Sequence, residues 1–236
     1  MSSFILKIIA IISMTCDHFS YVIYKKFTNL NYIGRLAFPI FAFQISEGYE
    51  HTKNLKKYFL RLFMFAIISQ IPFMLFKSRV TTGFSLNVFF TLLLGLLAIT
   101  IYDIFYKLES DNKAMHFFNN IFSIVCVICI ACISEALKCD YGYYGVAIIF
   151  LFHIFRQKKL LMNIGFIICT IIFYLKNILY SPYYSTYLYI IAFTCFSLFF
   201  INLYNNKKGK DLKYIFYLFY PIHLLLLYAL SFIYSA

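Results

Sequence analysis

The sequence predicts an all-α fold: a polytopic integral membrane protein with about nine transmembrane helices in one bundle. Hydrophobic residues make up 63% of the 236 residues and charged residues only 13%, and the mean hydropathy is +0.80. A soluble domain has roughly a quarter charged residues, so this chain has too few polar side chains to cover its surface in water. The apolar runs recur along the whole length. We therefore expect a single integral-membrane domain over residues 1–236, with the lipid bilayer as its partner.

Nine apolar segments are long enough, or nearly so, to cross a bilayer, because a transmembrane helix needs about 20 predominantly apolar residues. In chain order they are 4–24, 33–50, 59–76, 86–106, 117–137, 143–155, 160–180, 186–204 and 214–234. The sixth is short and has a glycine-rich entrance, Tyr141-Gly142-Tyr143-Tyr144-Gly145, so we expect it to be tilted or half-inserted.

The basic residues predict the orientation of these segments. If the loops alternate between two faces, fourteen of the 21 Lys and Arg residues fall on the side of the N-terminus. Loops on the cytoplasmic side carry the excess of Lys and Arg, so we expect a bacterial cytoplasmic-membrane protein with its N-terminus inside and its C-terminus outside. The same rule accounts for the net charge of +12 without a nucleic-acid partner.

The cysteines do not predict a metal site. Cys126, Cys129 and Cys132 have the C-x2-C-x2-C spacing that also occurs in iron–sulfur proteins. They lie, however, in the apolar stretch SIVCVICIACIS, where thiols pack as small hydrophobic groups.

The first segment carries Asp17 and His18 in its final third. A charged residue inside a bilayer costs about 2.5–3.5 kcal/mol on insertion scales, so these side chains need partners or a function. Neighbouring residues on a helix do not face each other, so the two cannot pair. Arg35, three residues into the second segment, is at a compatible depth, and an Asp17–Arg35 ion pair would either lock the helices together or serve a reaction. His18 is suited to proton transfer.

Charged residues cluster where the second segment ends, in EGYEHTKNLKKYFLR, residues 47–61. Grouped Lys and Arg side chains neutralise nucleotide phosphates, so the stretch predicts a phosphate-binding rim. Ordinary flanking by the positive-inside rule is the alternative. The candidate residues here are Glu47, His51, Lys53, Lys57 and Arg61.

Three polar residues lie in or beside later segments. Asn87 and Thr91 are one helical turn apart and either line a polar core or hydrogen-bond between helices. Asp140, in the stretch KCDYGYYG, is either a loop acid or lies where glycines let the backbone approach a ligand.

The last segment places His223 near the bilayer centre, two residues after Pro221. A proline inside a helix frees the carbonyl four residues earlier, here that of Tyr217. A histidine beside an interrupted hydrogen-bond ladder is a candidate for chemistry.

These residues lie in blocks that resemble the TraX family, which is named for a conjugal-transfer protein that N-acetylates pilin. The blocks keep the family's order and span nearly the whole chain: LKIIAIISMTCDH (6–18), IGRLAFPIFAFQISEGYEHTKNLKKYFLRL (33–62), NVFFTLLLGL (87–96), DYGYYGV (140–146) and FYLFYPIHLLLLY (216–228). Residues 107–137 and 156–213 match in hydropathy alone. The resemblance maps onto Asp17, His18, Arg35, Glu47, Gly48, His51, Thr52, Arg61, Asn87, Asp140 and His223.

The resemblance implies a membrane acyltransferase that uses acetyl-CoA as donor and needs no metal. The acceptor would be an amine or hydroxyl of an exported protein, such as a pilin-like N-terminus, or of a cell-envelope molecule. We expect His18, Asp17 and His223 to be catalytic, and Arg35, Glu47, Asn87 and Asp140 to bind substrate. We expect His51, Lys53, Lys57 and Arg61 to bind the cofactor.

Two other classes of function remain open on the sequence. The same polar residues would line the pathway of a small proton-coupled transporter, although no internal repeat is visible. The chain would alternatively be a non-catalytic membrane subunit of a conjugation or secretion system.

Overall fold

The computed structural model describes the chain except residues 25–26, 109–112, 211 and 234–236. The described residues form helices, with one isolated bridge between Leu86 and Cys139 outside them. In chain order the helices are α1 (Ser3–Ile23), α2 (Asn29–Gly34), α3 (Ala37–His51), α4 (Leu55–Lys77), α5 (Val88–Tyr106), α6 (Lys113–Ala136), α7 (Gly142–Ile154), α8 (Lys159–Tyr180), α9 (Tyr184–Asn202) and α10 (Lys213–Ile233).

The predicted all-α membrane architecture is confirmed. Among the described residues, seven helices are long and apolar enough to cross a membrane: α1, α4, α5, α6, α8, α9 and α10. The short helix α7 has 13 residues, close to the predicted segment 143–155. The helices bury part of their surface against one another and leave many large apolar side chains on the outside, as a bundle surrounded by lipid does.

The predicted continuous span 33–50 is wrong at its start, because a turn at residues 35–36 interrupts the helix and separates α2 from α3. A helix running through from residue 33 would place Pro39 in its interior, where the proline ring clashes with the carbonyl of Arg35. Instead α3 begins at Ala37, so Pro39 lies in its first turn, where proline is tolerated. As a result, α3 has only 15 residues and a length of ~22 Å, against ~30 Å for the hydrocarbon core of a bilayer.

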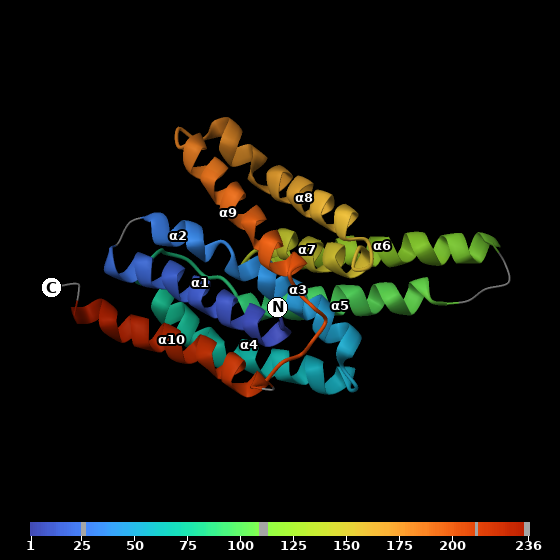
Figure 1. The fold of residues 1–236 in the computed structure, drawn as a ribbon, viewed down its shortest axis with the longest axis horizontal. Coiled ribbons are helices and arrows are strands. Elements are labelled where there is room, and N and C mark those ends of the chain that lie inside the picture. Colours follow the sequence, from blue (N-terminus) through green and yellow to red (C-terminus); the bar gives the residue numbers. More distant parts are fainter. Residues whose placement is uncertain (25–26, 109–112, 211, 234–236) are drawn as a thin grey trace.

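The short helices α3 and α7 lie together in the middle of the bundle (Figure 1). Helix α3 contacts α1, α5, α7 and α9, and α7 contacts α3, α5, α6 and α8. Phe38, Ile40 and Ala42 of α3 and Ile148 and Phe152 of α7 are almost or completely buried. The long helices therefore surround a central pair that is too short to span alone.

The helix ends define two ends of the bundle. Ser3 N donates to Lys207 O at 2.8 Å, which joins the start of α1 to the α9–α10 connection; we call this the N-terminal end. At the opposite end, the loop before α5 pairs with the loop before α7, since Asp140 N donates to Leu86 O at 2.9 Å.

Candidate functional site

The predicted ion pair between the first two segments forms. Arg35 Nη2 lies 3.0 Å from Asp17 Oδ1, and both side chains are mostly buried, with 18% and 16% exposure. The same Nη2 also donates to Tyr21 Oη at 3.3 Å. Gly34 makes the approach possible, because a Cβ there would lie 2.3 Å from Asp17 Cβ.

Asn31, which the sequence did not single out, holds this pair in place. Its side chain is fully buried, and Nδ2 donates to Asp17 Oδ1 at 2.9 Å. Its Oδ1 accepts from Ser20 Oγ at 2.8 Å and from Thr28 N at 2.7 Å. The available signal was the spacing Thr28-x-x-Asn31, a capping box that starts α2.

His18 and His223 meet, although 205 residues separate them in the chain. Nδ1 of His18 lies 2.8 Å from Nε2 of His223, and the ring planes are 5° from parallel. Nδ1 of His223 lies 2.9 Å from Phe219 O. The rings of Phe76 and Phe219 lie 4.9 Å from His18 and His223 respectively, so the imidazole pair lies among apolar groups. The sequence predicted each histidine as a candidate but not their contact.

Asp140 lies at the same end of the bundle as Arg35. It occupies the loop between α6 and α7, outside the spanning helices, and its carbonyl accepts a hydrogen bond from Thr91 Oγ1. Burial raises the pKa of Asp140 to about 6, and the positive charge of Arg35 opposes this rise. A carboxyl group within the field of Arg35 can therefore change charge near neutral pH.

Asn87 uses its side chain to join two helices. Oδ1 accepts from Phe89 N at 3.0 Å and so caps α5, while Nδ2 donates to Ala66 O at 2.7 Å and to Gln70 Oε1 at 2.8 Å. These bonds favour the interhelical alternative for this residue over substrate binding.

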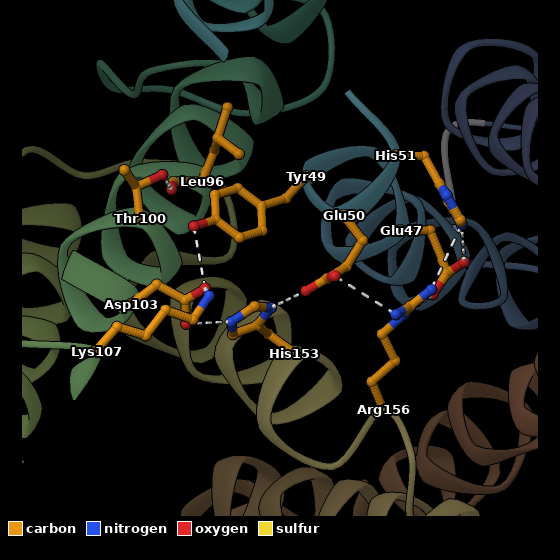
Figure 2. Close-up of polar contacts among 10 residues, drawn as sticks. All are labelled: Glu47, Tyr49, Glu50, His51, Leu96, Thr100, Asp103, Lys107, His153 and Arg156. Carbon is orange, nitrogen blue, oxygen red and sulfur yellow. Dashed lines mark hydrogen bonds and ion pairs between the residues drawn. The ribbon is translucent and has the colours of Figure 1, made fainter. Parts of the chain in front are cut away.

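A second polar cluster lies at the N-terminal end, where α3, α5 and α7 finish (Figure 2). Nε2 of His153 lies 2.9 Å from Asp103 Oδ1, and Tyr49 Oη donates to Asp103 Oδ2 at 3.1 Å. Lys107 Nζ lies 2.5 Å from the same Oδ2. His153 Nδ1 lies 3.6 Å from Glu50 Oε1.

Arg156 extends this cluster to the end of α3. Its Nε donates to Glu47 Oε1 at 2.6 Å, and its Nη1 lies 3.5 Å from Glu50 Oε2. His51 lies 3.4 Å from the other oxygen of Glu47. We call the whole cluster the ion-pair network; its members are Glu47, Tyr49, Glu50, His51, Asp103, Lys107, His153 and Arg156.

The sequence analysis missed three charged or titratable members of the ion-pair network that lie outside α3. Asp103, His153 and Arg156 were not candidates, although Asp103 lies within a predicted span and stands four residues before Lys107, the spacing of a helical ion pair. Glu47 and His51, predicted to bind substrate and cofactor respectively, contact each other, and Glu47 also contacts Arg156.

The remaining predicted cofactor residues lie just before α4 and in its first turns. Lys53, in the loop before α4, and Lys57 are exposed, whereas Arg61 is half-buried and lies 5.6 Å from the ring of Tyr58. From Ala37 to Glu47, α3 rises ~15 Å. The predicted site residues therefore form two groups, with Asp17, His18, Arg35, Asp140 and His223 toward the opposite end and Glu47, His51, Lys53, Lys57 and Arg61 at the N-terminal end.

Comparison with known proteins gives one family and two relatives. A family model described as TraX protein matches residues 2–231. The chain is 33% identical over 172 residues to a Dichelobacter nodosus protein described as "Probable fimbrial assembly protein FimC, serogroup H1", covering 67% of this chain and 64% of that protein. It is 29% identical over 182 residues to an uncharacterised protein of Rickettsia prowazekii (strain Madrid E), covering 77% of this chain and 65% of that protein. The chain thus spans less than two thirds of either relative, and no solved structure matches it.

Proposed function

The chain belongs to the TraX family, and we propose that it is a membrane-embedded acyltransferase. In this proposal it moves an acetyl group from cytoplasmic acetyl-CoA to an amine or hydroxyl of an exported acceptor. The observation that carries the proposal is the imidazole pair of His18 and His223, next in the chain to the Asp17–Arg35 ion pair. The imidazole pair supplies a base and Arg35 supplies a cation, the two groups that acyl transfer uses.

The chemistry proceeds by attack of the acceptor on the thioester carbonyl. A neutral imidazole takes the proton of the attacking amine or hydroxyl, and the carbonyl oxygen becomes an oxyanion. Arg35 stabilises this oxyanion. Within the described residues, Nε donates to Asn31 O and Nη2 donates to Asp17 and Tyr21, so Nη1 is the nitrogen left to contact the oxyanion. The carbon–sulfur bond then breaks, and the leaving thiolate takes the proton from the imidazolium.

The short central helices support a route for the donor. With the N-terminus in the cytoplasm, the exposed Lys53 and Lys57 would bind the phosphates of acetyl-CoA. The thioester arm would pass along α3, which rises ~15 Å between the two polar groups. Glu47 would shape the entrance, and Asp140 would lie beside Arg35 on the acceptor side.

The description of one relative supports an exported protein as the acceptor. The Dichelobacter nodosus protein is described as a fimbrial assembly protein, so an exported, pilin-like protein is the acceptor that we propose. Fimbrial subunits act outside the cytoplasmic membrane, which is where the opposite end would open if the N-terminus is inside.

Inside-out membrane vesicles supplied with radiolabelled acetyl-CoA test the proposal. We expect label to enter an envelope protein or lipid with the wild-type chain, and to fall to background with His18→Ala. His116→Ala is the matched control, because His116 is an exposed histidine on α6. Equal labelling by His18→Ala and wild type at equal protein level would remove His18 from the reaction.

A non-catalytic role in an assembly machine is the second candidate, and the fimbrial assembly description of the relative favours it. It predicts that Asp17, His18 and His223 can each be replaced without loss of surface fimbriae in a strain that depends on this chain. Loss of fimbriae in a well-expressed His18→Ala strain would exclude this candidate.

A further inference from the structure

We infer that His18 Nε2 is the reacting nitrogen and that His223 is a positioning residue that fixes the tautomer of His18. The assignment starts from Phe219 O, because a carbonyl oxygen can only accept a hydrogen bond. Nδ1 of His223 lies 2.9 Å from it and must therefore carry a hydrogen.

The hydrogen on Nδ1 of His223 fixes the donor and the acceptor in the next hydrogen bond. A neutral imidazole has a hydrogen on one nitrogen and a lone pair on the other, so Nε2 of His223 carries the lone pair. This Nε2 lies 2.8 Å from Nδ1 of His18, which must then be the donor. Nε2 of His18 is left with the lone pair that can take a proton or attack a carbonyl.

The geometry of the two rings fits this series of hydrogen bonds. The planes are 5° from parallel and the centroids are 5.1 Å apart, so with nitrogens 2.8 Å apart the rings meet edge to edge. An N–H in one ring plane then points along the lone pair of the other ring. Phe76 packs against His18 and Phe219 against His223, which restricts rotation of both rings.

His223 therefore cannot replace His18 as the base unless these hydrogen bonds are broken. Both nitrogens of His223 are already used, one donating to Phe219 O and one accepting from His18. When Nε2 of His18 takes a proton, its Nδ1–H can keep donating to His223, so the protonation step reverses no bond in the chain. In the Ser-His-Asp triad a carboxylate fixes the tautomer of the histidine. Here a neutral imidazole does so, and no additional charge is buried in the membrane interior.

The tautomer is tested without any activity. We would label the five histidines with 15N, place the whole protein in lipid nanodiscs, and assign His18 and His223 by single His→Gln variants. We expect the Nδ1–H form of His18 and of His223 at neutral pH. We also expect His18 to lose its preference for Nδ1–H in His223→Ala. An Nε2–H form of His18 in the wild-type protein would overturn the assignment.

The role of each nitrogen rests on the proposed function and is tested by acetyl transfer. We expect His223→Ala to lower kcat about 10- to 100-fold with an unchanged KM for acetyl-CoA, because His18 then has no fixed tautomer. His223→Gln should recover most of that loss, because its amide oxygen can accept from His18 Nδ1–H. His18→Gln should not recover, because it has no basic nitrogen.

The outcomes separate the two proposals. A His223→Gln variant as inactive as His18→Gln, while still well folded, would show that His223 takes part in the chemistry and would overturn its positioning role. Unchanged activity in His223→Ala would overturn it as well. If the wild-type protein transferred no acetyl group, the proposed function would fail, and the nuclear magnetic resonance result would still decide the tautomer.

Discussion

The histidine pair with its neighbouring Asp17–Arg35 ion pair and the ion-pair network lie at opposite ends of the short helix α3, and they satisfy buried polar groups differently. Asp17 has Arg35 as its charged partner and Asn31 as a neutral one. In the network, Asp103 contacts His153, Lys107 and Tyr49, while Arg156 contacts both Glu47 and Glu50. Several partners per charge mean that losing one leaves others to compensate.

This difference separates a region in which each charge has several partners from one in which each charge has a single charged partner. The network joins the ends of three helices, and two of its members are largely exposed, Lys107 at 70% and His51 at 56%. Asp17 and Arg35 have only each other as charged partners among the described residues, and within that part of the chain neither Arg35 Nη1 nor His18 Nε2 has a hydrogen bond. The N-terminal end is therefore held by several contacts per charge, whereas the opposite end depends on one ion pair and one pair of imidazoles.

Breaking the Asp17–Arg35 pair should have the largest effect. Asp17→Asn or Arg35→Gln alone leaves an uncompensated buried charge, a loss of about 3–5 kcal/mol in the free energy of unfolding. The double variant leaves neither charge buried, so its stability should recover. A double-mutant cycle on denaturant unfolding in detergent micelles measures the coupling.

Acetyl transfer by the double variant completes this test. We expect acetyl transfer to stay low, because the double variant has no Arg35 to stabilise the oxyanion. Recovery of both stability and activity would make the pair structural and would contradict its place in the reaction.

Arg156→Gln should have an intermediate effect on the network. It removes the 2.6 Å bond to Glu47 but leaves His51 beside that carboxylate, so we expect a loss of about 2 kcal/mol. The midpoint of denaturant unfolding measures it, and acetyl transfer at saturating acetyl-CoA should be unchanged.

Lys107→Ala is the matched control within the same network. Lys107 is 70% exposed and pairs with Asp103 across one helical turn, so its removal should cost less than about 1 kcal/mol. A loss as large as that of Arg156→Gln would show that the network is not redundant.

Asp140 should make the stability depend on pH. Its pKa in the folded protein, about 6, is above the ordinary value of 3.8, so the folded state binds the proton more tightly. The stability from this group is present below about pH 4 and is lost as the pH rises through about 6. Thermal unfolding of Asp140→Asn should lack this fall, whereas an equal fall in the variant would assign it to other groups.

Much of the fold follows from sequence because its signals are local. The boundaries of α1, α4 and α8 depend on runs of apolar residues, and they lie within a few residues of the predicted segments. The break before α3 also had a local signal, Pro39, which the hydropathy of segment 33–50 concealed. The Asp17–Arg35 pair was predictable because both residues lie in consecutive segments, where depth in the membrane follows from residue spacing.

The sequence by itself determined most of the helical segments and the distance of each polar residue from the ends of its helix, because a helix rises a fixed distance per residue. The tertiary structure alone decided which side chains meet: His18 with His223 across 205 residues, Asp103 with His153 across 50, and Glu47 with Arg156 across 109. In a membrane the faces toward lipid and toward protein are both apolar, so hydropathy does not reveal which face of a helix turns inward. That choice depends on how the side chains of all the helices pack together.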